Sequence, residues 1–377
     1  MYKVLTIAPT PPKISEVWMT RINDFIMPEN MFVSLASSIL DSPDSPHGGA
    51  SLSRTFGMPI KLHLYLFSKA IKARLNRILS ESPKDTVVFC HYLTTAVYLW
   101  KELKKFNKKI IIHCHGHDVT WDRRIEGLPF FRAHGFFYVA RAKKLIGKVT
   151  LIANSTCTKK KLIDIGFPEA DIIVNHLSVN TDELKPTRKP ESDKVNILYL
   201  GRLTDFKGPI ETIKAFEIAR SKGLKGDLHL VGGGTLKKAC AKLVAKSTFK
   251  ESIHLYGSVE RDRAMEFFGS ADIFTAHNKK SEKTKQEEAF GVSIIEAMSF
   301  GIPVVTGRSA GVTETIVDKK TGFLIPTGDI EAHANALLRL WSDPKLRIKM
   351  GAKGRKRAIE HFDSKRDKLR LRAILGI

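Results

Sequence analysis

The strongest constraint on the fold is the repeated alternation of short apolar runs with segments of helical periodicity. One series of apolar runs lies at residues 3–8, 86–90, 109–113 and 149–153, and a second lies at 195–200, 228–231, 253–256, 272–275 and 303–306. Short continuous apolar runs are typical of strands buried on both faces of a parallel sheet, and the helices between them supply the crossovers. The sequence therefore predicts an α/β fold with two Rossmann-like, doubly wound parallel sheets.

A break between the two series divides the chain. Residues 184–193 (LKPTRKPESD) have no apolar periodicity and contain two prolines and five charged side chains. Such a segment is typical of an interdomain linker, and 377 residues suffice for two hydrophobic cores. We expect an N-terminal domain over 1–184 and a C-terminal domain over 185–360. Ligands of such folds bind where the carboxyl ends of the strands meet, so the cleft between the domains is the expected site.

The composition excludes several classes of protein. With 43% hydrophobic and 27% charged residues the chain is expected to be globular, and it has no run of 18 apolar residues that would indicate a transmembrane helix. The four cysteines, Cys90, Cys114, Cys157 and Cys240, lie far apart and do not form the pairs typical of a disulfide framework or a zinc site. These features favour a cytoplasmic protein. The net charge of +23 favours an anionic partner, such as a phosphorylated substrate, an anionic membrane surface or a nucleic acid.

Two glutamates spaced eight residues apart mark the segment EAFGVSIIEAMSFGIPVVT, which begins at Glu288 and contains Glu296. On one continuous helix the two side chains would be about 80° out of register, so Glu288 is expected in the loop before a helix and Glu296 about one turn inside it. Gly291 permits a tight turn between them. The first N–H groups of the helix, at Val292 and Ser293, would then face the cleft, where they favour a phosphate. The carboxylates accept hydrogen bonds from sugar hydroxyls.

This E-x7-E segment resembles the signature of the retaining glycosyltransferases of family 4, which have the two-domain GT-B fold and include bacterial surface-polysaccharide enzymes. LYLGRLTDFKG at 198–208 resembles the family's diphosphate-binding segment, and VGGG at 231–234 resembles its next glycine loop. Residues 270–274 resemble the family's strand before the E-x7-E loop, and similar turns occur at 311–314 and 321–326, so the resemblance covers nearly all of 195–342. In the N-terminal half it is patchier and includes CHGHD at 114–118, NST at 154–156 and IGFP at 165–168. The family's last helix commonly crosses back to the N-terminal domain, which implies this placement for 361–377.

The resemblance implies a role for each matched residue. Arg202 and Lys207 would hold the leaving diphosphate, Glu288 would bind hydroxyls of the donor sugar, and Glu296 would bind the ribose. His115 would face the transferred sugar. The other donor-binding candidates are Gly201, Gly232, Gly233, Phe290, Gly291, Val292 and Ser293, and the acceptor-side candidates are Ser15, Glu16, His91 and Asp118. Two fixed cations and a helix N-terminus can stabilise the charge on the leaving phosphate, so no metal and no resident cofactor are expected.

Two segments depart from the family's pattern. Ser15 and Glu16 stand near the place where the family usually has a Gly-Gly pair after the first strand, and a Gly48-Gly49 pair occurs only later in the sequence. Ser178 and Asn180 stand where the family commonly has a Gly-Val-Asp turn. The first departure concerns the acceptor loop, whereas the second concerns a turn that is mainly structural.

Histidines alternate at His113, His115 and His117, so on a strand they would share one face and could ligate zinc. Gly116 indicates that the strand has already ended, and no evident carboxylate or cysteine completes a ligand set. We therefore favour contact with the sugar for His115, and a structural histidine is the alternative.

The sequence thus predicts a retaining hexosyltransferase that moves a sugar from a UDP- or GDP-type nucleotide sugar to a hydroxyl of a lipid-linked or surface-polysaccharide acceptor. A nucleotide-sugar epimerase or a phosphorylase of the same fold would use the same cleft. A nucleic-acid-binding protein is suggested by charge alone, without a recognisable motif or interleaved aromatic residues, so no nucleic-acid partner is expected.

The amphipathic segment 62–79 predicts a core-facing helix, with basic residues around its apolar stripe. These basic residues, Lys69, Lys72, Arg74 and Arg77, together with those of 101–109, also predict that the N-terminal domain docks on an anionic membrane surface. The protein is then expected to be peripheral on the inner face of the membrane.

Overall fold

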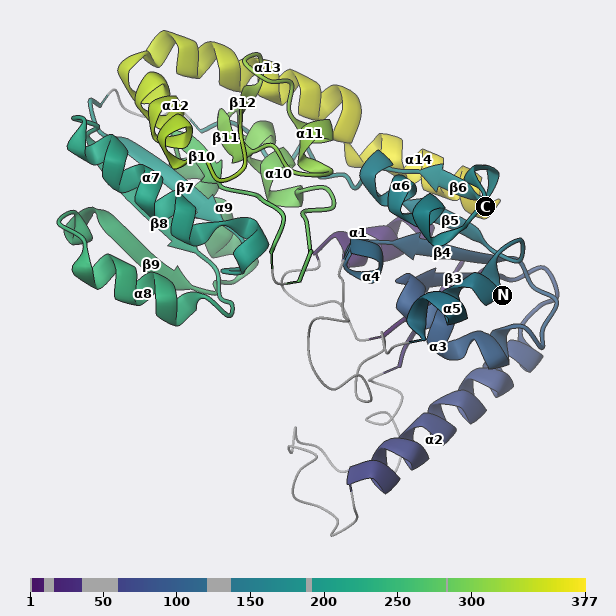
Figure 1. Ribbon diagram of the computed structural model, residues 1–377. Helices are drawn as coiled ribbons and strands as arrows, with labels where there is room; N and C mark the ends of the chain where they lie inside the picture. Colours follow the sequence, from purple (N-terminus) through teal and green to yellow (C-terminus); the bar gives the residue numbers. More distant parts are fainter. Residues whose placement is uncertain (1, 10–16, 36–59, 121–136, 188–191, 283) are drawn as a thin grey trace.

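The computed structural model describes residues 2–9, 17–35, 60–120, 137–187, 192–282 and 284–377. Two six-stranded sheets, each the centre of its own α/β domain, confirm the predicted architecture. Figure 1 shows the two domains side by side, with helices α13 (Pro344–Phe362) and α14 (Ser364–Leu375) running across the top of both. All the pairings between neighbouring strands are parallel.

The N-terminal sheet has the strand order β2-β1-β3-β4-β5-β6. Its strands are β1 (Val4–Ala8), β2 (Asn30–Ser34), β3 (Val87–His91), β4 (Ile110–Cys114), β5 (Thr150–Ala153) and β6 (Ile172–Val174). Its helices are α1 (Val17–Ile26), α2 (Ile60–Glu81), α3 (Leu93–Leu103), α4 (His117–Thr120), α5 (Tyr138–Ala142) and α6 (Thr156–Ile165). The inner strands β1, β3 and β4 are buried along their whole length, as their apolar sequences predict.

The C-terminal sheet has the strand order β12-β11-β10-β7-β8-β9. Its strands are β7 (Val195–Leu200), β8 (Gly226–Val231), β9 (Ile253–Gly257), β10 (Ile273–Ala276), β11 (Val304–Gly307) and β12 (Gly322–Ile325). Its helices before α13 are α7 (Pro209–Ser221), α8 (Lys237–Lys246), α9 (Arg261–Ser270), α10 (Val292–Ser299), α11 (Val312–Thr315) and α12 (Ile330–Ser342). The strand order turns back at β7 and β10, which is where open α/β sheets bind their ligands.

Three strands, β2, β6 and β12, were not predicted from the apolar pattern. Among the described strands, each lies at an edge of its sheet and pairs with one neighbour. β2 is half-buried over its first three residues, whereas β12 is buried throughout, and β6 is three residues long. Short apolar runs such as these do not by themselves distinguish a strand from a helix or a loop.

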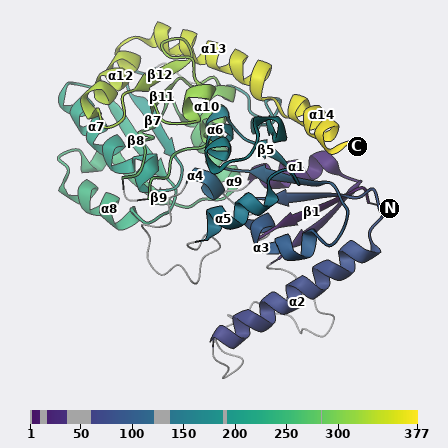
Figure 2. The same ribbon diagram turned by 45° about the vertical axis from the view of Figure 1, so that its right-hand side comes forward.

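The C-terminal end of the chain joins the two domains. Figure 2 shows α13 on the C-terminal domain and α14 on the N-terminal domain. Between these helices, the backbone of Val179 donates to the Phe362 carbonyl at 2.9 Å and accepts from the Ser364 N–H at 2.9 Å. The guanidinium of Arg372, on α14, then binds both carboxylate oxygens of Glu29 at 3.0 and 3.2 Å. The last helix is thus fastened to the domain that contains the first strand.

A single apolar cluster also spans the domain boundary. It contains Ile22 and Phe25 of the N-terminal domain, Leu177 of the connecting segment, and Phe290 and Phe362 of the C-terminal half. Because one core serves both domains along this line, the domains are packed together and not merely tethered. Among the helices that the structure describes, none has the length and apolar composition needed to cross a bilayer.

Candidate active site

The helix α10 begins where the E-x7-E segment predicts. Gly291, with a φ of 95°, is its N-cap, and a side chain there would overlap Ile294. Glu288 lies in the loop before the helix, and Glu296 lies inside it. The first N–H groups of α10, at Val292 and Ser293, have no acceptor within the helix, which leaves a partial positive charge at this end.

Glu288 forms an ion pair with Lys207, and both side chains are largely buried, at 13% and 15% exposed. Lys207 follows β7 in a short turn that ends at Gly208, whose φ of 62° and tight approach to the His277 backbone exclude a side chain. Burial alone would raise the pKa of Glu288, but Lys207, Arg202 and the Phe290 N–H outweigh it and lower that pKa. Glu288 is therefore a carboxylate at neutral pH, placed beside two cations.

Arg202 lies next to Lys207. The Arg202 guanidinium and the Lys207 ammonium lie 5.5 and 5.9 Å from the centre of the Phe206 ring. The hydroxyl of the buried Tyr199 donates a hydrogen bond to the Arg202 carbonyl at 2.8 Å and so fixes the start of this turn. The structure thus brings three of the predicted catalytic residues, Arg202, Lys207 and Glu288, into one charged group.

The glycine loop after β8 packs against the loop that carries Arg202. Side chains at Gly232 and Gly234 would overlap the carbonyl oxygens of Gly201 and Leu203. The Leu203 N–H donates to the Gly233 carbonyl at 2.8 Å. Close backbone contact therefore accounts for Gly232 and Gly234 without a ligand, and the loop supports the Arg202 turn.

Glu296 pairs with Arg261, a residue that sequence reasoning missed. The Arg261 Nη1 lies 2.5 Å from Glu296 Oε1, and the Glu296 residue is 5% exposed. Arg261 follows the carboxyl end of β9, the end of the sheet where ligands of such folds bind. It belongs to none of the sequence motifs that resemble the family. The ring of Phe290, which is predicted as a donor contact, stacks on His176 with the ring centres 5.3 Å apart.

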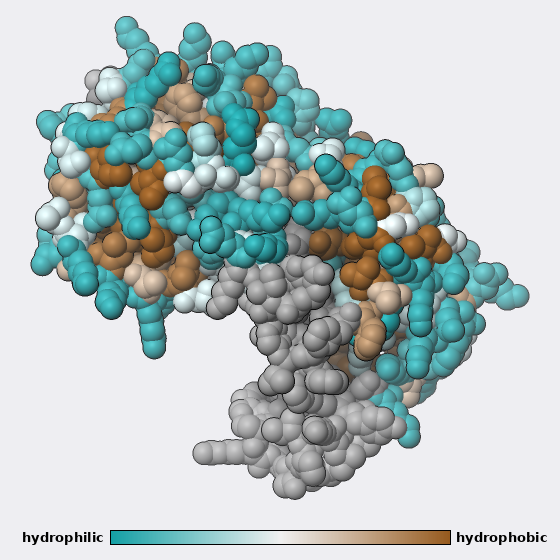
Figure 3. Space-filling model, in the orientation of Figure 1, coloured by the Kyte–Doolittle hydropathy of each residue, from teal (hydrophilic) through white to brown (hydrophobic). Residues whose placement is uncertain are grey.

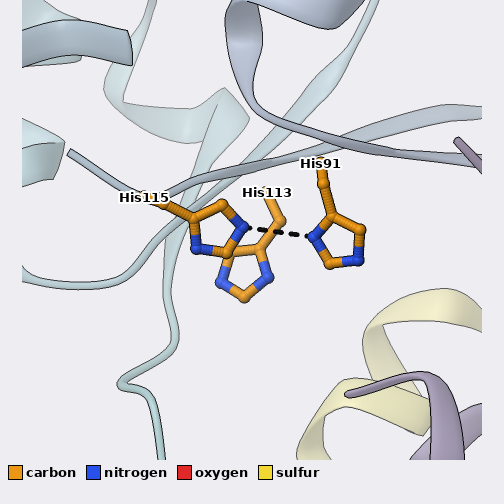
Figure 4. Close-up of side chains that lie close together, drawn as sticks. All are labelled: His91, His113 and His115. Atoms are coloured by element: carbon orange, nitrogen blue, oxygen red, sulfur yellow. Dashed lines mark hydrogen bonds between the residues drawn. The ribbon is translucent and has the colours of Figure 1, made fainter. Parts of the chain in front are cut away.

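His115 lies at the carboxyl end of β4 together with two other histidines. His91 and His113 are paired in register on β3 and β4, and His115 follows two residues later on the same face. Figure 4 shows the three rings close together, with His91 Nδ1 and His115 Nε2 3.2 Å apart. His117, the third member of the predicted alternation, is instead the first residue of α4.

The His115 loop touches the Glu288 loop across the domain boundary. Gly116, with a φ of 97°, follows His115, and a side chain there would overlap the Cβ of Ala289. Ala289 follows Glu288 directly. This contact places the histidine loop of one domain beside the carboxylate loop of the other.

Asp118, predicted on the acceptor side, has a structural use. Its carboxylate accepts hydrogen bonds from the Leu93 N–H at 2.8 Å and from the His115 N–H at 3.1 Å. It therefore holds the start of α3 and the histidine loop together. The other acceptor-side candidates, Ser15 and Glu16, and the Gly48-Gly49 pair lie outside the described residues.

A second contact between the domains was also missed. Glu314, at the end of the resemblance segment 311–314, accepts hydrogen bonds from the hydroxyl and the N–H of Thr156 at 2.6 and 3.0 Å and from the Cys157 N–H at 3.2 Å. His176 Nε2 lies 2.9 Å from the same carboxylate. A pocket of about 250 Å³ opens beside this contact and is lined by His176, Glu314 and Arg357 among others.

The turn that departs from the family's pattern has a structural explanation. The Ser178 hydroxyl and the Asn175 amide donate to the two carboxylate oxygens of Asp367, on α14, each at 2.6 Å. Ser178, which departs from the family's pattern, thus holds α14 against the N-terminal domain.

Residues 180–357 match the family model described as "Glycosyl transferases group 1". These residues, slightly less than half of the chain, are similar to that family. One relative is a GDP-mannose-dependent α-(1-6)-phosphatidylinositol monomannoside mannosyltransferase of Mycolicibacterium smegmatis. It is 26% identical, and the match covers 83% of this chain and 82% of that protein. Another is the amylovoran biosynthesis glycosyltransferase AmsK of Erwinia amylovora, 28% identical over 64% of this chain and 57% of that protein.

Solved structures have the same fold as this chain. Anabaena Alr3699/HepE in complex with UDP has a TM-score of 0.74 at 16% identity, and 99% of each chain is covered. Sucrose-phosphate synthase from Thermosynechococcus elongatus has a TM-score of 0.76 at 17% identity, covering 99% of this chain and 98% of that one. The GT-B fold expected from the sequence is therefore confirmed.

Proposed function

We propose that the protein is a retaining glycosyltransferase that moves a hexose from a nucleotide diphosphate sugar to an acceptor hydroxyl, without a metal ion at the diphosphate. The observation that carries this proposal is the charged group formed by Arg202, Lys207 and Glu288 in front of α10. Two cations and a helix N-terminus lie there near one carboxylate, and a diphosphate joined to a sugar would need both kinds of group.

The division of roles follows from charge. Arg202, Lys207 and the N–H groups of Val292 and Ser293 attract the donor's phosphates and stabilise the negative charge that develops as the diphosphate leaves. The Glu288 carboxylate repels phosphate but accepts hydrogen bonds from sugar hydroxyls. His115 precedes Gly116, whose contact with Ala289 brings the histidine loop beside the Glu288 loop, and in this proposal it contacts the transferred sugar.

The reaction breaks the bond between the anomeric carbon and the diphosphate oxygen and forms a bond from that carbon to the acceptor oxygen. The acceptor hydroxyl loses one proton, and the departing diphosphate oxygen takes it. Arg202 and Lys207 neutralise the remaining charge of the diphosphate. The proposal therefore needs no separate protein base.

The donor and acceptor classes rest on the relatives. One is named as GDP-mannose-dependent and as acting on a phosphatidylinositol mannoside, and another as an amylovoran biosynthesis enzyme. A structural neighbour holds UDP. We infer a UDP- or GDP-sugar donor and an acceptor that is lipid-linked or part of a surface polysaccharide.

A lipid-linked acceptor agrees with docking of the N-terminal domain on an anionic membrane. Lys69 and Arg74 are exposed on α2, which projects from this domain in Figure 1, and the Lys72 ammonium lies 5.0 Å from the ring centre of Tyr98 on α3. Hydrophobic side chains also reach the surface of this domain, including Phe137 at 72% exposed, and Figure 3 shows such side chains gathered among hydrophilic ones. Lys108 and Lys109 instead bind backbone carbonyl oxygens. Lys101, Lys104 and Lys105 of the same predicted cluster are exposed. We therefore assign docking to the α2 residues together with these three lysines.

Vesicle co-sedimentation tests the docking. Vesicles with anionic lipid should retain the protein and neutral vesicles should not, because each basic residue near such a surface contributes about 1 kcal/mol. The triple variant Lys69→Gln, Lys72→Gln, Arg74→Gln should lose retention, whereas Lys319→Gln with Lys320→Gln in the C-terminal domain should keep it. Equal retention of both variants would contradict the assignment.

The variant Glu288→Gln tests the proposed function. It should lower transfer to an added acceptor by at least about 100-fold, because removing a group that binds the reacting sugar costs transition-state stabilisation. The exposed Glu282 of the same loop offers a control, and Glu282→Gln should keep full transfer. Full activity of Glu288→Gln would contradict the proposal, and donor conversion without acceptor would indicate an epimerase instead.

A further inference from the structure

The buried histidine cluster at the carboxyl ends of β3 and β4 has a composition that donor binding does not require. Contact with a sugar needs one imidazole at most, yet His91 and His113 lie behind His115 and are 0% and 1% exposed. One nitrogen from each ring lies within 4.8 Å of the corresponding nitrogens of the other two. Within the part of the chain that the structure describes, His91, His113 and His115 are the histidines that meet in such a group of three.

His113 gives an independent indication of a ligand. Neither of its ring nitrogens has a hydrogen-bond partner among the described residues, although the side chain is almost fully buried. A neutral imidazole carries one donor and one acceptor, and burying both without partners is unfavourable. The His113 ring centre lies 4.2 Å from that of His115, so the unsatisfied ring points into the cluster.

The backbone explains why the three rings converge. His91 and His113 are register partners on adjacent parallel strands, and the two-residue repeat of β4 puts His115 on the face of His113. The Asp118 carboxylate then fixes the His115 backbone through its N–H. The positions of the three side chains are therefore set by rigid elements, which is what a metal site requires.

We propose that His91, His113 and His115 form a binding site for a transition-metal dication of the zinc type. Three imidazoles are a known ligand set for such ions, with metal–nitrogen distances of about 2.0–2.1 Å, which separates the nitrogens by about 3.3 Å. His91 Nδ1 and His115 Nε2 are already 3.2 Å apart, and a nitrogen of His113 lies within 4.8 Å of both other rings' nitrogens. The set contains no carboxylate and no thiolate, so Mg²⁺ and Ca²⁺ are disfavoured.

The site would regulate transfer and would not serve the diphosphate. A metal ion on His115 occupies the imidazole that, in the proposed function, faces the transferred sugar. Bound zinc should therefore inhibit transfer. This consequence rests on the proposed function, whereas metal binding itself does not.

Metal titration of the full chain tests the site. Chelator-treated protein is titrated with Co²⁺, whose visible absorption reports a tetrahedral site, and Zn²⁺ is then added in competition. We expect one equivalent to bind, with affinity lowered by at least about 100-fold in His113→Leu. In the control His254→Gln, which alters the surface His229–His254 stack, that affinity should be unchanged. No saturable binding, or equal affinity in His113→Leu, would overturn the site.

A second measurement covers the case in which His113→Leu does not fold. X-ray absorption at the zinc edge of the wild-type complex should show three imidazole ligands, and a shell with fewer than two imidazoles or with sulfur would overturn the site. Transfer assays are kept separate. Zinc should inhibit the wild-type enzyme by a larger factor than His113→Leu, and tight zinc binding without inhibition would retain the site but reject its regulatory role.

Discussion

The Glu314 carboxylate and the Thr156 hydroxyl come from different domains and lie 2.6 Å apart. The same carboxylate also accepts the Thr156 and Cys157 N–H groups at the start of α6, so it acts as the cap of a helix in the other domain. With His176 as a further partner, one residue connects the C-terminal domain to two segments of the N-terminal domain.

Glu314→Gln should therefore destabilise the protein by about 1–3 kcal/mol, because several hydrogen bonds lose a charged acceptor and one oxygen becomes an amide donor. The unfolding midpoint in denaturant measures the effect. Glu169→Gln offers a control, since Glu169 forms an exposed ion pair with Lys159 and its loss should change stability by less than about 1 kcal/mol. Equal stabilities of the two variants would show that the Glu314 contact is not formed in solution.

The same contact predicts a pH dependence. Burial raises the pKa of Glu314, but the hydrogen bonds from His176, Thr156 and Cys157 outweigh it and leave that pKa below its ordinary value. A carboxyl whose pKa is lowered by folding stabilises the protein above its unfolded pKa, and the contribution is lost as the pH falls through the folded value. Acidification from pH 6 towards pH 3, the range of about 3 units around a carboxyl pKa, should thus destabilise the wild type more than Glu314→Gln. Parallel stability curves for the two proteins would contradict this.

Gly116 and Gly147 form a matched pair of substitutions. Both have positive φ, 97° and 69°, but a side chain at Gly116 meets Ala289 of the other domain, whereas one at Gly147 meets nothing within 4 Å. Alanine at either position should cost about 1–2 kcal/mol from backbone strain. Only Gly116→Ala should also push the His115 loop from the Glu288 loop and lower kcat/KM by at least about 10-fold. A similar loss of kcat/KM in Gly147→Ala would remove the steric explanation.

Lys207→Met should weaken binding of a nucleoside diphosphate by about 10- to 100-fold, since a charge-assisted hydrogen bond contributes about 1.5–3 kcal/mol. The substitution also leaves Glu288 without its ion-pair partner. The double variant with Glu288→Gln removes that unpaired carboxylate, so it separates loss of the phosphate contact from the effect of the unpaired charge. The surface residue Lys225, paired with Asp193, gives the control Lys225→Met. Calorimetry measures each affinity, and wild-type affinity in Lys207→Met would exclude a phosphate contact.

Local patterns predicted what depends on local sequence. The inner strands were found because a strand buried on both faces needs a continuous apolar run, and Glu288, Gly291 and Glu296 fell where the helical repeat puts them. The edge strands β2, β6 and β12 were missed although each contains three consecutive apolar residues, because so short a run does not distinguish a strand from a helix or a loop. The start of α10 could be placed because a glycine with positive φ is the ordinary way to enter such a turn.

Contacts between residues far apart in the sequence could not be predicted. Arg261 and Glu296 are separated by 35 positions, and Thr156 and Glu314 by 158, and no spacing rule connects them. The histidine alternation shows the same limit. His117 has the same spacing but lies in α4, so it is not on the sheet face that carries His113. His91 lies on that face because β3 pairs in register with β4. Register between strands is a property of the sheet, which one sequence does not display.

The central claim is that Arg202, Lys207 and the start of α10 form a metal-independent site for a nucleoside diphosphate sugar. Calorimetry with UDP, GDP, ADP, CMP and their common sugars, in the presence and absence of EDTA, tests it most directly. We expect one diphosphate nucleotide and its sugar to bind with equal affinity in both conditions, and we expect Lys207→Met to weaken binding of both. Binding that disappears in EDTA, or no binding by any member of the panel, would contradict it.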